Sequence, residues 1–414
     1  MGSRRIISTI ERYSAQNYDR YPFVVARAEG AGLWDPEGNL YVDFLGGYGG
    51  NPEHMWDVAT EALQRYLSDP ARHAGLISNV MYSVAYAEFC ETICRFTEYD
   101  RVLAKCGGGE VCNSVLEAFN LHAEIDGIKT PEVIVIEHCF HGRGNHFQNL
   151  YKGRETVWPK LVQVAHSAKA VEEAINGNTV GILMEVQGGE GCRLDKTGVY
   201  PAIHQVARKY GKRIVVDEIQ AGFGRCGPQF SFQKWGEKAY RPDGMVLAKI
   251  LGGGMEAVSA FVGTNDLMRV FKPDSDGSTF SGNPKGCIVA TAVLRYLEQH
   301  PLGGRACEIG KRFADHLAGI PHITVEYEGA MICIKIEGGP SPKSLCHDLV
   351  SNRHDPRVFM KYGHTYGNTH YVRATPPILA MTNDILDKSC VKTIRPAFMR
   401  WSEEIEKSLT HRVV

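Results

Sequence analysis

Short apolar runs alternate with stretches of helical spacing through the middle of the chain. The helical stretches are Glu110–Ile125 and Tyr200–Tyr210, and the apolar runs are Val133–Ile136, Gly181–Val186, Arg213–Val216 and Met245–Ala248. Strands that are apolar on both faces and separated by helices are typical of a parallel sheet covered on both sides. The pattern therefore predicts an α/β domain, and in such sheets ligands bind at the carboxyl ends of the strands.

The two ends of the chain have a different pattern. Residues 31–44, AGLWDPEGNLYVDF, predict a strand, a turn at Asp35–Gly38 and a second strand in which apolar and polar residues alternate. The region after Thr291 mixes helices with a strand pair around Ile323–Ile336. Because 414 residues are too many for one compact core, these ends predict a second, smaller α+β domain, with its boundary near helix 285–300.

Bulk composition argues against several classes of protein. Lys and Arg number 46 against 47 Asp and Glu, so the chain has no strong field to attract nucleic acid. The longest apolar runs are far too short to span a bilayer, and the N-terminal segment lacks a signal-peptide pattern. We therefore expect a cytoplasmic protein that binds neither nucleic acid nor membranes.

The 12 cysteines are scattered along the chain, and no CxxC pair is among them. The sequence therefore gives no support for a zinc site, and we predict no metal. In a cytoplasmic protein of this length we expect the thiols to be reduced and mostly buried.

Two ionisable residues follow apolar strands. Asp217, in VVDEIQAGFGR, ends one strand, where its carboxylate would project into the ligand crevice. The alternative is an aspartate that caps the next turn. Lys249, in MVLAKILGGG, follows the next apolar strand and precedes three glycines. An amine that loses its solvation beside a cation can act as a nucleophile, but a lysine before glycines is more often a solvated loop residue.

Three further segments suggest binding chemistry. Gly107–Gly109, in KCGGGEVCNSVLEAF, lead into a helix whose first N–H groups would suit a phosphate. Phe140, in HCFHGRG, closely follows a strand, where its face could stack on a planar ring. Ser278 and Thr279, in DGSTFSGNP, offer hydroxyl and amide donors. Each segment would be interpreted as an ordinary loop if it stood alone.

The order of these five segments resembles that of the class III aminotransferases, which are pyridoxal 5′-phosphate (PLP) enzymes of fold type I. The resemblance extends from about Tyr18 to about Asp387; DEIQAGFGR is highly specific, and AKILGGG and STFSGNP are close to the family pattern. It implies an α/β fold with a large domain, built on a mostly parallel seven-stranded sheet, plus a smaller α+β domain. The implied division is an N-terminal segment, 1–50, that is part of the small domain, a large PLP-binding domain, 51–290, and a C-terminal small domain, 291–414.

The roles of the cofactor residues follow from the resemblance. Lys249 would carry PLP as a Schiff base, and Asp217 would bind the pyridine nitrogen and keep it protonated. The other cofactor positions would be Gln220 at the ring hydroxyl, Phe140 and Ile219 on the two ring faces, the amides of Gly108 and Gly109 at the phosphate, and Ser278 with Thr279 as further phosphate donors. In this family the threonine reaches the phosphate of the neighbouring subunit. The resemblance therefore implies a homodimer with shared active sites, and leaves open whether dimers assemble further.

Within the family, five positions resemble those of the ornithine δ-aminotransferases. Tyr18 matches a tyrosine that contacts the substrate's α-carboxylate, and Tyr48 one that lies near its α-amino group. Arg143 matches an arginine that pairs with a carboxylate. Glu190 matches a glutamate that masks a second arginine, and Arg373, in YVRATPP, matches that arginine. The resemblance implies transfer of the terminal (ω) amine of an ornithine-like diamino acid to 2-oxoglutarate, giving a semialdehyde and glutamate.

The sequence also departs from the family pattern. The Glu185–Glu190 segment lacks the usual proline, Gly107 replaces a small hydroxyl residue, and Gly109 replaces a larger one. These departures leave open a related PLP reaction of secondary metabolism, namely elimination, lyase or cyclisation chemistry on a modified ornithine- or arginine-like amino acid. A catalytically silent binding protein of the same fold is a second alternative, and the presence of both Lys249 and Asp217 argues against it.

Overall fold

The chain forms two compact units. The structure is a computed structural model that describes residues 2–69, 75–156, 158–190, 193–236, 238–339, 341–366 and 369–410. The large unit comprises Asp57–Gly303, and the small unit comprises Met1–Trp56 together with Gly304–Val414.

A seven-stranded sheet forms the centre of the large unit, in the order β4-β12-β11-β10-β7-β5-β6. Its strands are β4 (Arg101–Lys105), β5 (Glu132–Ile136), β6 (Lys160–Val164), β7 (Thr179–Met184), β10 (Arg213–Asp217), β11 (Gly244–Leu247) and β12 (Ser259–Gly263). Neighbouring strands are parallel except at β12, which runs antiparallel to both β11 and β4. The four predicted apolar runs correspond to β5, β7, β10 and β11, so the predicted α/β fold class is confirmed.

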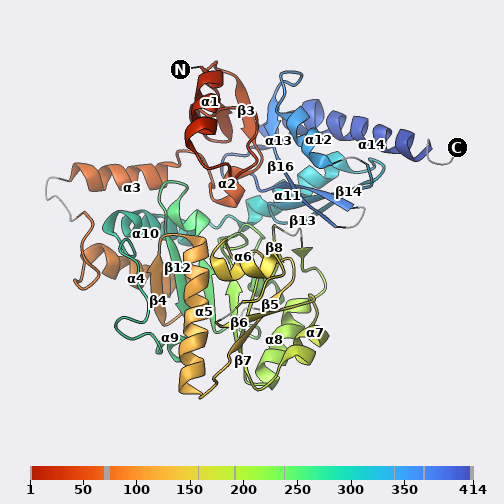
Figure 1. Cartoon of the computed structure of the whole chain (residues 1–414). Coiled ribbons are helices and arrows are strands. Elements are labelled where there is room, and N and C mark those ends of the chain that lie inside the picture. The colour runs from red at the N-terminus through yellow and green to blue at the C-terminus, as the bar shows by residue number, and fades with distance from the viewer. Residues whose placement is uncertain are drawn as a thin grey trace. The chain divides into compact units, whose positions relative to one another are not determined.

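Helices surround this sheet (Figure 1). They are α3 (Asp57–Ser68), α4 (Val84–Thr97), α5 (Gly108–Ile125), α6 (Asn145–Tyr151), α7 (Ala168–Ala174), α8 (Val199–Lys209), α9 (Asn265–Met268) and α10 (Pro284–Gln299), with the 3-10 helices η1 (Ser231–Trp235) and η2 (Lys249–Gly252). A separate two-stranded sheet is formed by β8 (Gln187–Gly188) and β9 (Arg193–Leu194). Local sequence fixes the helix starts. Ser83 accepts a hydrogen bond from Tyr86 N at the start of α4, and Asn283 caps α10, where Pro284 occupies the first turn.

The main core of the large unit lies between α5 and the sheet. Val111, Val115 and Phe119 of α5 are fully buried against apolar strand residues such as Val215. The Phe119 ring lies directly over β7, because a Cβ on Gly181 would be only 2.4 Å from ring carbons. Each fully buried Val or Phe side chain stabilises the fold by about 1.5–3 kcal/mol. This packing fixes α5, and therefore its first turn, at one edge of the sheet.

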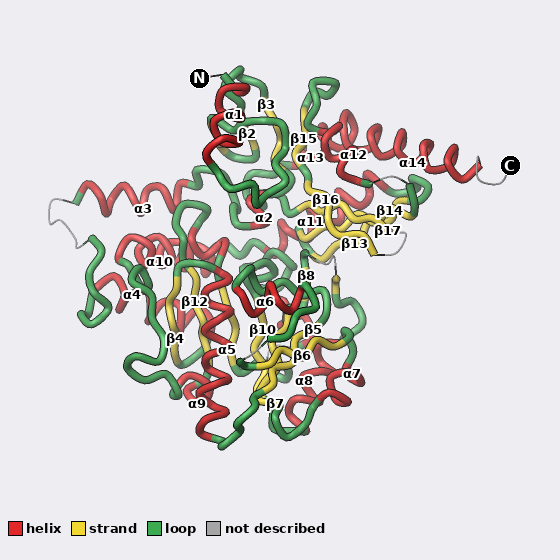
Figure 2. Tube along the Cα trace, viewed as in Figure 1, coloured by secondary structure: helices red, strands yellow, loops and turns green. Residues whose placement is uncertain are grey.

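The small unit contains two four-stranded sheets, which are coloured yellow in Figure 2. One has the order β1-β2-β3-β15, from β1 (Arg27–Glu29), β2 (Gly32–Trp34), β3 (Leu40–Asp43) and β15 (Arg357–Phe359). The other has the order β13-β14-β17-β16, from β13 (Ile323–Glu328), β14 (Met331–Glu337), β16 (Lys361–Tyr366) and β17 (Thr369–Ala374). The predicted hairpin at residues 31–44 and the predicted pair around Ile323–Ile336 are both antiparallel pairs here.

The helices of the small unit lie at both ends of the sequence. They are α1 (Ser3–Tyr13), α2 (Gly46–Gly49), α11 (Gly303–Leu317), α12 (Pro342–Leu349), α13 (Asn383–Ser389), the π-helix η3 (Cys390–Ile394) and α14 (Arg395–Thr410). No helix in the described part of the chain is long and apolar enough to cross a membrane.

The described cysteines are mostly thiols. Ten have a free thiol, and six of these are buried: Cys112, Cys139, Cys226, Cys287, Cys346 and Cys390. The expectation of thiols throughout is wrong at Cys333, which is disulfide-bonded.

Candidate active site

Asp217 and Lys249 lie at the same edge of the seven-stranded sheet. Strands β10 and β11 are parallel, and Asp217, the last residue of β10, is opposite Val246 of β11. Lys249 follows the end of β11 and begins η2. Its φ of 52° lies in the left-handed region, which costs a residue other than glycine on the order of 1–3 kcal/mol. The fold therefore holds an amine and a carboxylate together at the carboxyl ends of the strands, and it does so with a strained lysine backbone.

Three donors surround the buried carboxylate of Asp217. The backbone N–H of Ile219 donates to Oδ1 at 3.0 Å. His141 Nδ1 lies 2.8 Å from Oδ2, and the Cys112 thiol donates to the same oxygen at 3.4 Å. The side chains of Asp217, His141 and Cys112 are buried. These bonds fix the carboxylate's orientation.

His141 is a charged partner of Asp217. Burial alone would lower the pKa of this imidazole, but hydrogen bonds to Asp217, Cys112 and Cys139 outweigh that effect and raise its pKa well above the ordinary value. The backbone N–H of His141 also donates to the Tyr151 hydroxyl at 2.7 Å. The imidazolium and the carboxylate therefore form a buried ion pair, joined through Nδ1 of His141.

A second buried carboxyl group, Glu185, lies beside this ion pair. Its Oε2 accepts the backbone N–H of Phe140 at 2.9 Å. Burial and the negative charge of Asp217 raise the pKa of Glu185 to about 7. Glu185 thus holds the backbone at Phe140, and the Phe140 ring stacks on Tyr151 with the ring centres 6.0 Å apart.

The predicted phosphate loop has the arrangement of an anion site. Gly107 is the N-cap of α5, and the first N–H groups of a helix have no acceptor within that helix. Glu110 Oε2 accepts from the amides of Cys106 and Gly107, at 3.2 Å each. The carboxylate therefore binds the amides before the helix and leaves those of Gly108 and Gly109 for a ligand.

Close backbone approach explains the glycines around this loop. Gly142 has a φ of 96°, and a Cβ there would be 2.5 Å from the Cα of Gly109. A Cβ on Gly108 would be 3.2 Å from Ile219 Cδ1. Gln220 is buried, and its Oε1 would be 1.9 Å from a Cβ on Gly189. Glycine at these positions lets the phosphate loop approach the segments after β5 and β10, and lets the segment after β8 approach the segment after β10.

The loop that carries Ser278 and Thr279 is tied to the phosphate loop of its own chain. Lys105, at the end of β4, is buried and forms an ion pair with Asp276. The Glu110 carboxylate is hydrogen-bonded by Ser278, and Asn79 Nδ2 donates to Ser278 O at 2.8 Å. Thr279 itself is exposed.

The predicted substrate residues divide between the two units. In the small unit, the Arg373 guanidinium lies 5.6 Å from the centre of the Tyr48 ring, and Arg373 is only 5% exposed. Tyr48 has a φ of 58°, and Tyr18 of the same unit is exposed. In the large unit, Arg143 is exposed beside the phosphate loop, and Glu190 is half-buried after β8.

Sequence reasoning missed three residues of the site. His141 directly follows Phe140, which could have drawn attention to it. Glu185 and Cys112 lie within apolar segments, one after β7 and one inside α5, and no local pattern distinguishes them from core residues. Only the fold brings all three to Asp217.

The comparisons with known proteins identify the family of the chain. The chain matches the family described as aminotransferase class-III over residues 13–148 and 148–395. It is 31% identical over 411 residues to ornithine aminotransferase 2 of Staphylococcus aureus (strain MRSA252), covering 96% of this chain and 99% of that protein.

Solved structures are similar over the whole chain. The ornithine aminotransferase of Toxoplasma gondii ME49 has a TM-score of 0.86 and 27% identity, covering 98% of this chain and 96% of that one. The acetylornithine aminotransferase of Elizabethkingia anophelis has a TM-score of 0.79 and 27% identity, covering 98% and 100%. The chain therefore belongs to the class III aminotransferases, as an ornithine-aminotransferase-like, PLP-dependent enzyme.

Proposed function

We propose that this enzyme moves the ω-amine of an ornithine-like diamino acid to 2-oxoglutarate, giving a semialdehyde and glutamate. The observation that carries the proposal is the contact between Arg373 and Tyr48. It brings together two of the five positions at which the sequence resembles ornithine δ-aminotransferases. The names of the relatives in Staphylococcus aureus and Toxoplasma gondii support the same substrate class.

The residues at the sheet edge fit PLP. When bound, PLP supplies an aldehyde that bonds to an amine and a ring that stores electrons. We assign the amine to Lys249, which also moves the proton at the reacting carbon as general base. The carboxylate of Asp217, with its three donors, would face the pyridine nitrogen. The amides of Gly108 and Gly109, which Glu110 leaves available, would bind the phosphate.

The remaining cofactor positions complete the assignment. We assign Phe140 and Ile219 to the two ring faces and Gln220 to the ring hydroxyl. The contact of Ile219 with Gly108 supports this, because it puts a ring-face residue next to the phosphate amides. Ser278 and Thr279 would supply further phosphate donors.

Dual specificity would come from a masked arginine. We infer that Tyr18, Tyr48 and Arg143 bind the α-carboxylate and α-amino group of the diamino acid. Glu190 would neutralise Arg373 during this half-reaction. When 2-oxoglutarate or glutamate binds, Glu190 would move aside, and the planar guanidinium would bind the α-carboxylate through two hydrogen bonds.

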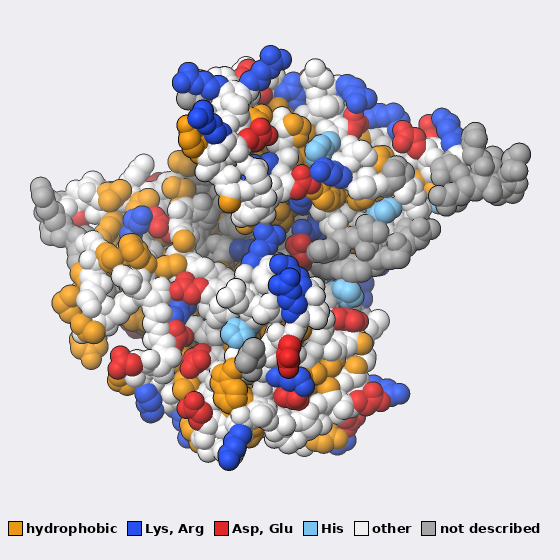
Figure 3. Space-filling view, in the orientation of Figure 1, with side chains coloured by type: hydrophobic (Ala, Val, Ile, Leu, Met, Phe, Trp, Pro, Cys, Tyr) orange, Lys and Arg blue, Asp and Glu red, His pale blue; other side chains and the backbone are white. Residues whose placement is uncertain are grey.

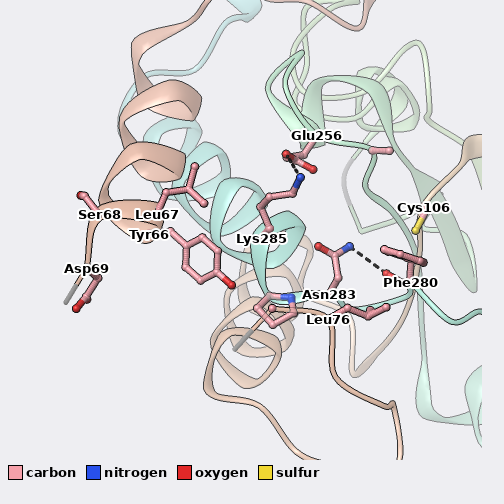
Figure 4. A pocket seen from close by; sticks show the side chains of 13 residues that line it. Tyr66, Leu67, Ser68, Asp69, Leu76, Cys106, Glu256, Phe280, Asn283 and Lys285 are labelled. Atoms are coloured by element: carbon pink, nitrogen blue, oxygen red, sulfur yellow. Dashed lines mark hydrogen bonds and ion pairs between the residues drawn. The ribbon is translucent and has the colours of Figure 1, made fainter. Parts of the chain in front are cut away.

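The large unit has a surface suited to a second copy of the chain. We call it the apolar patch: Leu67, Leu76, Val80, Met81, Tyr82, Val84 and Phe280, all exposed. Orange side chains gather over α3 and the segment before α4 in Figure 3. Leu67, Leu76 and Phe280 line an open pocket of about 950 Å³ that also includes Cys106 (Figure 4). Exposed apolar surface of this kind marks an interface, and it supports a homodimer in which Thr279 reaches the partner's cofactor phosphate.

Separate half-reactions test the substrate assignment. Ornithine and glutamate are each mixed with the enzyme, and the cofactor's visible absorbance is followed by stopped flow. Arg373→Ala should slow the glutamate half-reaction about a hundredfold, because a charged pair is lost, and should spare the ornithine half-reaction. Glu190→Ala should speed the glutamate half-reaction and leave the ornithine half-reaction no faster.

The alternative chemistry predicts a different result. If Arg373→Ala slows both half-reactions equally, or neither, the arginine does not select between substrates. Product analysis with ornithine- and arginine-like amino acids would then show elimination or cyclisation products in place of a semialdehyde and glutamate.

A further inference from the structure

Cys112 is placed by the same helix that forms the phosphate loop. It follows Gly108, the first residue of α5, by four positions, so both residues lie on one face of the helix. Cys112 is fully buried, and α5 packs firmly on the sheet through Val115 and Phe119. One rigid element therefore positions both the phosphate amides and the Cys112 thiol.

The thiol contacts Asp217 at a defined atom. Sγ lies 3.4 Å from Oδ2, the oxygen that also interacts with His141, while Oδ1 accepts the N–H of Ile219. A carboxylate that is held by the imidazole and one amide can still tilt about its Cβ–Cγ bond. A third donor, which approaches from α5, restricts that motion.

The thiol is in its donating form. Burial and the negative charge of Asp217 raise the pKa of Cys112 to about 12. A thiolate could not donate, and it would place a second negative charge beside the carboxylate. The S–H group is a weak donor, but its acceptor here is a charged carboxylate, which strengthens the bond.

The spacing within this cluster is that of hydrogen bonds and not that of ligands around a metal ion. Cys112, His141 and Asp217 form a group of possible ligands within the described residues. Tetrahedral zinc with bonds of about 2.0–2.3 Å would separate its ligand atoms by about 3.3 Å or more. The observed separation of 2.8 Å between His141 Nδ1 and Asp217 Oδ2 is that of a charge-assisted hydrogen bond.

We propose that Cys112 is a positioning residue, whose thiol holds the Asp217 carboxylate in one orientation toward the pyridine nitrogen of the cofactor. The proposal rests on the assignment of Asp217 to that nitrogen and does not depend on which amino acid is the substrate. The five substrate-side residues play no part in it.

Infrared spectroscopy of the holoenzyme tests the bond directly. The S–H stretch lies in a region free of other protein bands, and subtracting the Cys112→Ala spectrum isolates the Cys112 thiol from the other cysteines. We expect a band shifted to low frequency by the carboxylate, and we expect Asp217→Asn to move it toward the frequency of a free thiol. A band that Asp217→Asn leaves unchanged would overturn the proposal.

Kinetics test the consequence of the bond. Cys112→Ala should slow the half-reaction of any productive amino donor at saturation about tenfold, the value of a modest hydrogen bond to a charged group. The apparent affinity for the amino-donor substrate should change little. Cys112→Ser keeps a hydrogen-bond donor at this position and should restore the rate to within about twofold of the wild type. Cys390→Ala, which removes a buried thiol in the small unit, is the matched control and should keep the wild-type rate.

Two results would contradict the proposal even if every variant folds. Equal loss in Cys112→Ser and Cys112→Ala would mean that position 112 serves packing alone. Stoichiometric zinc bound by the wild type and lost in Cys112→Ala would make the cluster a metal site. Failure of ornithine as a donor would contradict only the proposed substrate, because the infrared band does not depend on turnover.

Discussion

At the scale of single residues, Asp217 is the group whose environment is best defined. Its Oδ2 interacts with both His141 and Cys112. Asp217→Asn removes the negative charge and can turn an N–H group toward two donors. We expect turnover to fall about a hundredfold, because a charged hydrogen bond worth on the order of 3 kcal/mol is lost where charge develops in the transition state. Cofactor affinity, measured by equilibrium dialysis, should change far less, and near-normal turnover would refute the electron-storing role.

Lys249 gives a second prediction at this scale. Its place after β11 and its left-handed backbone make it the one lysine that we assign to the cofactor. Lys249→Ala should abolish covalent labelling after borohydride reduction and should stop transamination, although PLP can still bind without a covalent bond. Peptide mass spectrometry is the measurement, and a label that persists on another lysine would disprove the assignment.

Glu218 predicts a pH dependence of stability. Burial raises its pKa to about 7 from 4.5, although Ser231 and Phe232 donate to Oε1 at 2.7 and 3.3 Å. A folded-state pKa above the unfolded value means that this contribution to stability is fully present below about pH 4.5 and is lost as the pH rises through about 7. Glu218→Gln keeps the acceptor without the titration.

The pH prediction is measured by comparing two proteins. From about pH 5 to about pH 8, the wild type should lose more of its apparent melting temperature than Glu218→Gln does. Glu185 has a raised pKa in the same range and contributes to both curves. The contribution of Glu218 is therefore the difference between the melting temperatures of the two proteins at each pH. Parallel curves would show that Glu218 does not take up a proton on folding.

Sequence patterns drew attention to the candidate residues that follow apolar strands, and they missed those that contact Asp217 only through the fold. Asp217 and Lys249 could be predicted because apolar strands end beside them. Cys112 and His141 are separated from Asp217 by 105 and 76 positions. Their contacts depend on how α5 and the segment after β5 pack around β10, and no local pattern encodes that packing.

At the scale of elements, the phosphate loop depends on contact between two backbones. Gly142→Ala would place a Cβ 2.5 Å from Gly109 Cα, at a φ of 96°. The loop must move to relieve this clash, so we expect PLP affinity to fall at least tenfold, about 1.4 kcal/mol or more. Fluorescence titration of the apoenzyme with PLP measures the loss.

A matched glycine separates this clash from backbone strain. Gly127 also has a left-handed φ, of 71°, but a Cβ there meets nothing within 4 Å. Gly127→Ala should therefore lose stability without losing cofactor affinity. Equal losses of affinity in the two variants would show that strain, and not contact with Gly109, is responsible.

At the scale of elements, the sequence predicted which segments form strands better than it predicted the order and direction of those strands in the sheet. The four apolar runs became β5, β7, β10 and β11. The strand β12 lies between β11 and β4 and is antiparallel to both. Its direction could not be predicted, because a strand buried on both faces has the same sequence pattern in either direction.

At the scale of the whole molecule, the apolar patch predicts that assembly and cofactor binding are linked. Val80 and Tyr82 are almost fully exposed, at 90% and 105% of their reference areas, and such side chains are stabilised when a partner covers them. Asn79, next in sequence to Val80, holds the Ser278 carbonyl at 2.8 Å. The same surface therefore carries the apolar side chains and the loop assigned to the partner's phosphate.

Tyr82→Glu tests this link. A charge within the patch should dissociate the proposed dimer, as measured by analytical ultracentrifugation, because an unpaired carboxylate would have to be buried in the interface. The resulting monomer should bind PLP more weakly, since it would lack the Thr279 that we assign to the partner's cofactor phosphate. Ile125→Glu, at an exposed apolar residue outside the patch, is the control and should remain dimeric.

Thr279→Ala should weaken PLP binding without dissociating the dimer. If Tyr82→Glu gives a monomer that binds PLP as tightly as the wild type, each chain contains a complete cofactor site, and the apolar patch serves assembly alone.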